Sequence, residues 1–283
     1  MVTNTELDKK TDELFDRTHI YWDKSKEDMW SQMEELISDV EDKKVVRLNT
    51  QWVRYAVAAA IIALLAIPVS MRLYTRTIEC QPGEHLAYQL PDGSVVHLNA
   101  NSSLAYHPAW WRFSRKLEFK GEGFFEVEKG SAFTVESHKG ATEVLGTSFN
   151  VFARDDMYSV TCVTGKVKVM AAETNNQVLL LPNENANLNQ NGKLEVKKGV
   201  ETGQVIGWVQ KRFVFTATPL NSVFEEISRQ YGIPISLEEE NSSTYTGYFT
   251  LDYSVEETLE LICKPFNLEF VRNTENGYTI LAQ

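Results

Sequence analysis

Polar and apolar residues divide the chain into an amphipathic arm, one continuous apolar segment and a long region of alternating positions. The apolar segment, RYAVAAAIIALLAIPVSMR, has no charged residue between Arg54 and Arg72. A helix needs about 20 apolar residues to cross a bilayer, and one drawn from Trp52 to Tyr74 reaches about 35 Å, longer than the hydrocarbon core. The pattern predicts a single transmembrane helix over residues 52–74, with the two arginines as its flanks.

The surroundings of this segment argue against two alternatives and indicate an orientation. About fifty residues precede it, too many for a signal peptide, and it lacks the polar stripe of a buried core helix. Four Lys or Arg residues lie within residues 43–54, whereas two lie within residues 72–111. The positive-inside rule therefore places the N-terminus in the cytoplasm and exports the larger C-terminal region.

Residues 1–50 predict a short helical segment with an apolar face. Ser25, followed three residues later by the acidic Asp28, is typical of a helix start. The arm is acidic, which suits a basic partner, and its apolar face is interpreted as a partner-binding surface that is covered only in a complex. A solvated arm beside the membrane is the alternative. The candidate contact residues are Trp22, Trp30, Met33, Leu36 and Ile37.

Between residues 78 and 205 the apolar positions recur every second residue, which is the period of a β-strand. The stretch LPDGSVVHLNANSSLAYHP opens with a Pro-Asp-Gly turn at residues 91–93, after which apolar and polar residues alternate. Short strands at this spacing predict an all-β domain, either a sandwich, a barrel or a solenoid. Further strands are predicted at residues 116–119, 123–127, 133–137, 143–145, 149–153, 158–163, 166–171 and 177–181.

The predicted C-terminal domain, residues 208–283, carries two similar halves within residues 212–282, each with the pattern of a strand, a helix and a strand. In the first half, Thr218 is predicted to cap a helix with Pro219 at its first position, and Gly232 is predicted to end that helix. In the second half, Ser254 and Glu257 predict a capping box. Two β-α-β units predict a compact α+β domain whose open sheet edges can accept a partner strand.

The composition excludes several classes of function. The net charge is −11 and no cluster of Lys and Arg occurs, which argues against direct binding to nucleic acid. Three cysteines, Cys80, Cys162 and Cys263, without a C-x-x-C pair exclude a multi-disulfide framework and a four-cysteine zinc site. Buried or unpaired thiols are expected at these positions.

No catalytic, cofactor-binding or metal-binding set is predicted. The stretch GEGFFE at residues 121–126 contains G-x-G, but no helix pattern follows it, and LGTSFN at residues 145–150 lacks the second glycine of a nucleophile elbow. The histidines at positions 85, 97, 107 and 138 form no H-x-H or H-E-x-x-H pair. An enzyme is therefore disfavoured.

The ordered set LPDGSVVHLNANSSLAYHP, GEGFFEVEKGSAFTVES, VLGTSFNV and CVTGKVKV resembles the FecR family of anti-sigma factors, from about residue 80 through the C-terminal module. The chain departs mildly from the family's GEAYFEV, because it has Gly123-Phe124-Phe125 there. The resemblance implies a cytoplasmic helical segment, one transmembrane helix, an all-β, solenoid- or sandwich-like periplasmic domain, and a C-terminal domain similar to the secretin/TonB short N-terminal fold.

The resemblance also implies partners and a location. In such a protein of the Gram-negative inner membrane, the cytoplasmic arm binds an extracytoplasmic-function sigma factor. The periplasmic part contacts the signalling domain of a TonB-dependent transporter, and uptake genes for ferric siderophores or glycans respond. Family behaviour implies stepwise cleavage by periplasmic and intramembrane proteases. Pro68 is the candidate processing determinant, since it removes a backbone donor, although a proline near a tolerant helix end is the plainer interpretation.

Two other functions remain open from the sequence. One is a membrane-anchored periplasmic module that binds glycan or peptidoglycan without controlling a sigma factor; an exposed aromatic row on the β domain would favour it. The other is a membrane-anchored hydrolase, which would need a nucleophile and a base within hydrogen-bond reach in a cleft.

Overall fold

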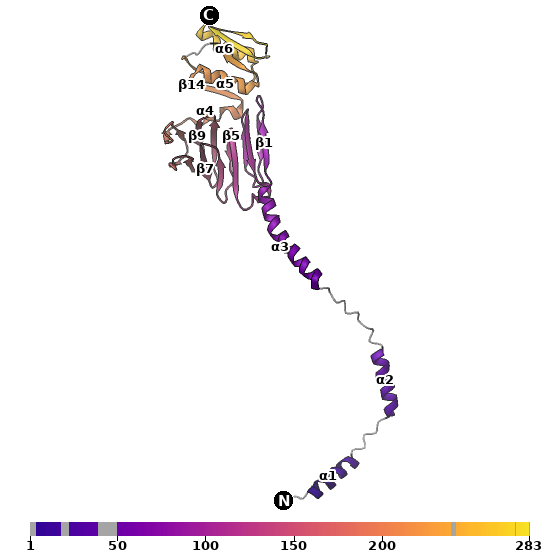
Figure 1. Cartoon of the computed structure of the whole chain (residues 1–283). Coiled ribbons are helices and arrows are strands. Elements are labelled where there is room, and N and C mark those ends of the chain that lie inside the picture. Colours follow the sequence, from indigo (N-terminus) through magenta and orange to yellow (C-terminus); the bar gives the residue numbers. More distant parts are fainter. Residues whose placement is uncertain (1–3, 18–22, 39–49, 239–241, 275, 283) are drawn as a thin grey trace. The chain divides into compact units, whose positions relative to one another are not determined.

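The computed structural model describes residues 4–17, 23–38, 50–238, 242–274 and 276–282 (Figure 1). The chain forms two compact units, residues 1–62 and 63–283. The first contains the helices α1 (Asn4–Arg17) and α2 (Lys26–Ser38) and the beginning of α3 (Thr50–Leu73). The second contains the end of α3, a β domain and a C-terminal module, and it positions most of the features considered below.

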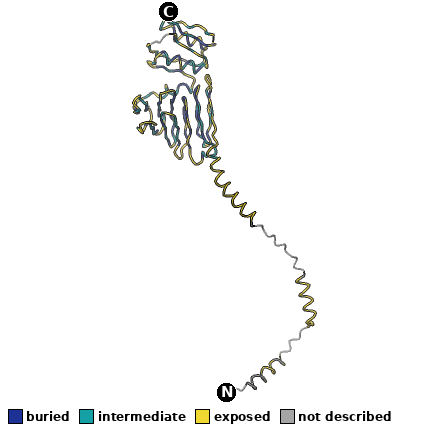
Figure 2. The backbone as a smooth tube through the Cα atoms, viewed as in Figure 1, coloured by how far each residue is buried: buried dark blue, intermediate teal, exposed yellow. Residues whose placement is uncertain are grey.

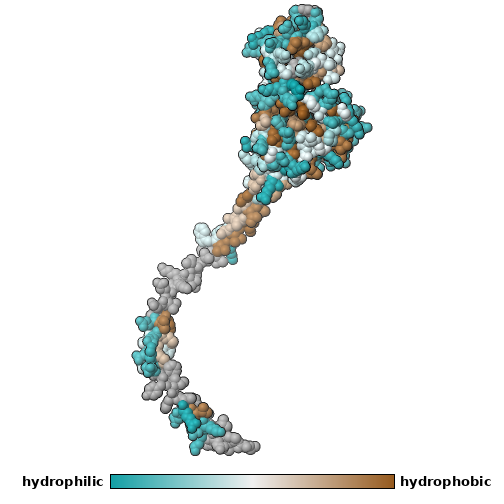
Figure 3. Space-filling view, turned by 180° about the vertical axis from the view of Figure 1, so that it is seen from behind, coloured by the Kyte–Doolittle hydropathy of each residue, from teal (hydrophilic) through white to brown (hydrophobic). Residues whose placement is uncertain are grey.

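The α3 helix covers the apolar segment that the sequence indicates. Its membrane-compatible part runs from Gln51 to Leu73 with a mean hydropathy of 2.2, and none of the window is buried inside the chain. Figures 2 and 3 show this helix as exposed and mostly apolar. Because such a surface is unfavourable in water, it is suited to lipid. This is the one candidate transmembrane helix in the described parts of the chain, as predicted.

The β domain is a single thirteen-stranded sheet that folds over into two layers. The layers meet along β5, whose first half pairs with β4 and β6 and whose second half pairs with β3 and β8. The main path through the sheet is β11-β10-β7-β6-β5-β8-β9-β12-β13. The strands are β1 Arg76–Cys80, β2 Leu86–Gln89, β3 Val95–Leu98, β4 Ser102–Tyr106, β5 Arg115–Glu126, β6 Phe133–Glu136, β7 Gly140–Val144, β8 Ser148–Arg154, β9 Met157–Cys162, β10 Val167–Ala171, β11 Gln177–Leu180, β12 Glu184–Leu188 and β13 Leu194–Lys198.

The core of the β domain lies between the two layers. Buried and half-exposed positions alternate along most strands, as in β4 and β7, which explains the period of two in the sequence. Phe125 and Phe149 are fully buried and stack with ring centroids 5.1 Å apart. Burying such a side chain stabilises the fold by about 1.5–3 kcal/mol. The all-β prediction is confirmed, and the folded sheet is nearly closed.

Two details of the β domain differ from the sequence prediction. The strands expected at residues 116–119 and 123–127 form one continuous strand, β5, because the chain bends at Gly121 without leaving the sheet. Gly121 has a φ of 109°, which suits glycine, and a Cβ there would collide with Ser102. The sequence predicts no strand at β1, β2, β12 or β13, and the strands of the domain span residues 76–198.

The C-terminal module is α+β, with two small sheets and two main helices. Its core is formed by the apolar faces of α5 and α6, including the fully buried Phe224, Ile227 and Leu259. The antiparallel pair β14–β16 forms one sheet, and β15–β18–β17 forms the other. The elements from the linker onward are α4 Thr202–Val205, η2 Gly207–Gln210, β14 Arg212–Pro219, α5 Leu220–Tyr231, β15 Ile235–Leu237, β16 Thr244–Thr250, α6 Val255–Cys263, η3 Lys264–Phe266, β17 Leu268–Arg272 and β18 Tyr278–Ala282.

The helix ends of this module test three predicted caps. Ser254 accepts from the Glu257 N–H, and the Glu257 carboxylate accepts from the Ser254 N–H, so the capping box is confirmed. Gly232 ends α5 in the left-handed conformation, as predicted. The predicted cap at Thr218 is wrong, since α5 begins one residue later with Pro219 as its N-cap and no side-chain cap bond.

The three cysteines are buried and unpaired, as expected. Burial raises the pKa of each thiol to about 11. A thiol with so high a pKa stays protonated and unreactive at neutral pH. The cysteines therefore act as small apolar core residues.

Candidate functional site

The arm helix α2 presents an uncovered apolar face. Ser25 caps it as predicted, since its hydroxyl oxygen accepts from the Asp28 N–H at 3.1 Å. Trp30 is 59% exposed and Leu36 is 72% exposed. Figure 3 shows apolar atoms gathered along one side of this helix and polar atoms along the other. The uncovered residues on the face are Met29, Trp30, Met33, Leu36 and Ile37.

Most of the predicted contact residues therefore lie together on one element. Spacings of three and four residues bring Trp30, Met33 and Ile37 onto neighbouring turns of α2. The first turn also carries the acidic Glu27 and Asp28. Trp22, the remaining candidate, lies outside the described residues.

Pro68 lies inside α3, close to its C-terminal end. A proline has no N–H, so the helix loses one i to i−4 bond at this point. Two residues later, the Ser70 hydroxyl donates to the Ile67 carbonyl at 2.8 Å. Arg54 and Arg72 lie in the first and last parts of the same helix, and the Arg72 guanidinium is 5.9 Å from the centre of the Trp110 ring.

A buried polar cluster joins the β domain to the C-terminal module. The Glu122 carboxylate, on β5, accepts from the side-chain amides of Asn99 at 2.8 Å and Asn150 at 3.0 Å. Gln230, on α5, donates to Asn99 Oδ1 at 2.6 Å and to Glu226 Oε1 at 2.7 Å. These bonds connect the folded sheet to the first helix of the module through side chains alone.

The charge of this cluster depends on Glu122. Burial, helped by the nearby Glu226 carboxylate, raises the pKa of Glu122 to about 7, against the opposing effects of Asn150, Arg154 and Asn99. Burial also lowers the pKa of the Arg154 guanidinium. A carboxyl with this pKa exchanges its proton near neutral pH, so the contact between the two domains carries a titratable group.

Two aromatic groups extend the same junction. His85 Nε2 lies 2.6 Å from Gln230 Oε1, and its ring contacts Trp208 edge-on at 5.8 Å. Trp208, in η2, is buried and donates to Asn150 Oδ1 at 3.4 Å. The linker between the domains is therefore packed against the polar cluster.

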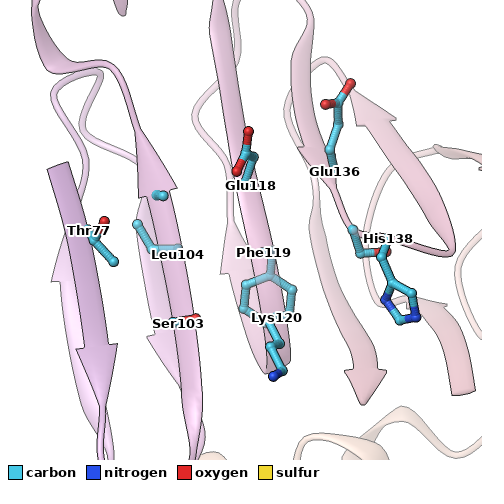
Figure 4. Close-up of a pocket in the computed structure, with 10 residues that line it drawn as sticks. Thr77, Ser103, Leu104, Glu118, Phe119, Lys120, Glu136 and His138 are labelled. Carbon is cyan, nitrogen blue, oxygen red and sulfur yellow. The ribbon is translucent and has the colours of Figure 1, made fainter. Parts of the chain in front are cut away.

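The outer face of the β domain has a shallow depression of about 430 Å³ (Figure 4). Glu118 and Lys120 of β5 line it together with His138. The Ser137 hydroxyl is already engaged, since it donates to the Gly140 carbonyl at 3.0 Å. Among the described residues no group of three or more His, Cys, Asp or Glu side chains is placed to hold a metal ion. No hydrogen bond pairs a nucleophile with a base among the residues that line this depression.

The comparisons with known proteins give the family. The FecR protein model matches residues 76–168 and the FecR C-terminal model matches residues 212–280. Two crystal structures of a proposed anti-sigma factor from Parabacteroides distasonis are similar. The first is 31% identical with a TM-score of 0.67, over 74% of this chain and 100% of that chain. The second is 32% identical with a TM-score of 0.66, over 74% and 99%.

No curated protein matches the sequence. The chain belongs to the FecR family of anti-sigma factors, which confirms the resemblance drawn from the four motifs. This family is regulatory and not enzymatic, and an anti-sigma factor has a sigma factor as its partner. With one candidate transmembrane helix among its described residues, the chain fits a single-pass membrane protein.

Sequence reasoning missed the polar cluster at the domain junction. Glu122, Asn99 and Asn150 lie inside the family motifs, but they were interpreted as turn and strand residues. The signal available was an acidic residue flanked by Gly121 and Gly123, between the apolar residues Phe119 and Phe124. An acidic residue at such a position is a candidate for a buried carboxylate, and a buried carboxylate needs hydrogen-bond partners.

Proposed function

We propose that this chain is a single-pass anti-sigma factor of the Gram-negative inner membrane that binds an extracytoplasmic-function sigma factor through α2. The observation that carries the proposal is the uncovered apolar face of α2, which precedes the candidate transmembrane helix, whereas both family-matched domains follow it. The bias of Lys and Arg supports a cytoplasmic arm and periplasmic domains. The acidic first turn of α2 favours a basic surface on the sigma factor.

On the periplasmic side, the proposed partner is the signalling domain of a TonB-dependent outer-membrane transporter. The C-terminal module supports this because its sheets are small and have open edges, at β14, β16, β15 and β17. An open edge can pair with a strand of a partner. Binding of a ligand by the transporter then changes the state of the module, and transcription of uptake genes follows.

The signal is proposed to reach the arm by cleavage of the chain, first by a periplasmic and then by an intramembrane protease. Pro68 supports the second step because the helix is weakened there and nearby backbone is easier to expose. Within this scheme Pro68 is a determinant of processing and takes no part in the chemistry of the proteases.

A co-purification experiment tests the function. The full chain in detergent is expected to retain a sigma factor encoded beside it. A variant in which Trp30 and Leu36 are both replaced by serine is expected to lose it. Equal retention by the two proteins would remove α2 as the binding site and with it the cytoplasmic half of the proposal.

The glycan-binding alternative receives no support from the surface of the β domain. Among the described residues of this domain, Phe113 is the one aromatic side chain that is largely exposed, at 68%. The other rings are buried or half-buried, so no aromatic row of the kind that stacks on sugars is present in the described part of the domain.

A further inference from the structure

The β domain begins almost directly at the end of α3. The helix ends at Leu73 and β1 begins at Arg76, so two residues, Tyr74 and Thr75, connect them. An extended residue spans at most about 3.3–3.6 Å, so this end of the sheet lies within roughly 10 Å of the helix end. Since Arg76 pairs with Tyr106, the last residue of β4, the loop that follows β4 starts at the same end.

That loop, residues 107–114, contacts the end of α3. His107 Nδ1 lies 3.3 Å from the Tyr74 carbonyl oxygen and 3.2 Å from Thr75 Oγ1. The Arg72 guanidinium, in the last turn of α3, lies 5.9 Å from the centre of the Trp110 ring. The loop therefore lies beside the point where α3 leaves the bilayer.

The loop carries a packed aromatic pair, of which Phe113 is exposed and Trp110 is half-buried. The rings of Trp110 and Phe113 lie 4.8 Å apart, and Phe113 is 68% exposed. Trp111 between them points inward, where its ring contacts Phe133 edge-on at 5.7 Å. The segment ends on the buried Arg115, whose guanidinium is 2.9 Å from an Asp92 oxygen. The exposed Phe113 ring, with the half-buried Trp110 ring beside it, is thus carried by a loop that buried neighbours hold in place.

The composition of the loop is that of a membrane interface. Trp and other aromatic residues with Arg gather at the level of the lipid headgroups, and the headgroup regions add about 5–7 Å to each side of the hydrocarbon core. The stretch HPAWWRFSRK, residues 107–116, contains no acidic residue, although the whole chain has a net charge of −11. Arg112, between Trp110 and Phe113, is exposed.

We propose that the loop His107–Ser114 is a second membrane contact. The side chains of Trp110 and Phe113 enter the headgroup region of the leaflet from which α3 emerges, and Arg112 and Arg72 face the lipid phosphates. The partner of the loop is the bilayer, because the loop lies beside the end of α3, where that helix leaves the bilayer. The inference rests on α3 spanning the membrane and is independent of sigma-factor binding. Its consequence is that the β domain is held against the membrane in one orientation.

Spin labelling of the full chain in nanodiscs tests this contact. The three native thiols are buried, so a cysteine introduced as Phe113→Cys can be labelled selectively. Tyr248→Cys, at a 70% exposed position of the C-terminal module, is the matched control. In nanodiscs of phosphatidylcholine and phosphatidylglycerol, the ratio of oxygen to nickel-chelate collision rates is expected to be several-fold higher at 113 than at 248. Equal ratios would overturn the proposal.

A third label, at Leu65→Cys in α3, separates this inference from the transmembrane assignment. A high ratio at 65 together with a low ratio at 113 contradicts only the loop contact, and the loop then faces water or a protein. A low ratio at 65 contradicts the span and the loop contact together. Arg112→Ser is expected to lower the ratio at 113 in the nanodiscs that contain phosphatidylglycerol, and no change would remove the assigned role of Arg112.

Discussion

At the scale of single residues, the most consequential group is the carboxyl of Glu122. It is buried, it accepts from Asn99 and Asn150, and through Asn99 it is connected to Gln230 of the C-terminal module. Burial and the Glu226 carboxylate raise its pKa from 4.5 to about 7. The protonated form is therefore favoured in the folded chain relative to the unfolded chain, and folding stability depends on pH.

The first prediction concerns this dependence. Between pH 4.5 and about 7 the folded chain keeps a proton on Glu122 that the unfolded chain releases, so stability decreases as the pH rises through this window and then levels off. The Glu122→Gln variant is expected to lose most of that decrease, as measured by thermal unfolding of the full chain in detergent. Glu118→Gln, an exposed carboxyl on the same strand, is the control and should keep the decrease. Identical pH profiles for wild type and Glu122→Gln would show that Glu122 does not cause the loss of stability.

Gly121 gives the second prediction at this scale. An alanine there must adopt a φ of 109° and its Cβ would overlap Ser102, so the two layers of the sheet must shift. Gly121→Ala is expected to lower the free energy of unfolding by about 2 kcal/mol or more. Gly203→Ala in α4, where no atom lies within 4 Å of the new Cβ, should leave stability nearly unchanged. Chemical denaturation of both variants measures the difference.

At the scale of elements, α2 and α3 owe their roles to uncovered apolar surfaces of different kinds. The α2 helix has one apolar face and one polar face, which suits a protein groove, whereas α3 is apolar around its circumference, which suits lipid. Both patterns are local in sequence, a repeat of three to four residues in α2 and an unbroken apolar run in α3, so both can be predicted from the sequence. The width of the apolar surface therefore indicates the partner: a single apolar face on α2 suits a protein, and a fully apolar circumference on α3 suits lipid.

Binding by α2 is predicted to depend on its aromatic and aliphatic anchors. Trp30→Ala is expected to weaken sigma-factor binding by about 2 kcal/mol or more, which is more than tenfold. Gln32→Ala, on the same helix, is the control and should bind as the wild type does. Titration of the full chain in nanodiscs with the purified sigma factor measures both constants. Similar losses for both variants would indicate damage to the helix and not the removal of a contact.

Processing is predicted to depend on the break in α3. Pro68→Leu restores the missing backbone bond, and we expect slower inducer-dependent release of an N-terminal fragment, followed by immunoblot of the arm. Val69→Leu, a neighbouring change that leaves the proline in place, is expected to release the fragment at the wild-type rate. An unchanged rate in Pro68→Leu would exclude a role for Pro68.

At the scale of the whole molecule, the predictable part of the structure is the part that local sequence determines. The helical periods, the capping box at Ser254 and the strand alternation follow from neighbouring residues. The polar junction does not, since Asn99 and Gln230 are 131 positions apart. The long strand β5 was divided in the prediction because glycine usually interrupts a strand. Gly123 does not interrupt the strand. Glycine is needed there because the Phe119 ring occupies the place where a Cβ would lie.

The position of β1 has a mechanical consequence. This edge strand follows α3 at one end, and just beyond its other end the Gly83 N–H donates to the Arg229 carbonyl of α5 at 2.8 Å. A pulling force that enters the sheet from the C-terminal module, through the chain after β13, and leaves it through α3 would act along β1 against the rest of the sheet. Its hydrogen bonds to β4 lie perpendicular to the strand, so the pairs from Arg76↔Tyr106 to Cys80↔Ser102 would bear the load in shear, together. A force from the C-terminal module would therefore reach α3 before the pairs between β1 and β4 separated. The β domain would stay folded and pass the force on to the transmembrane helix.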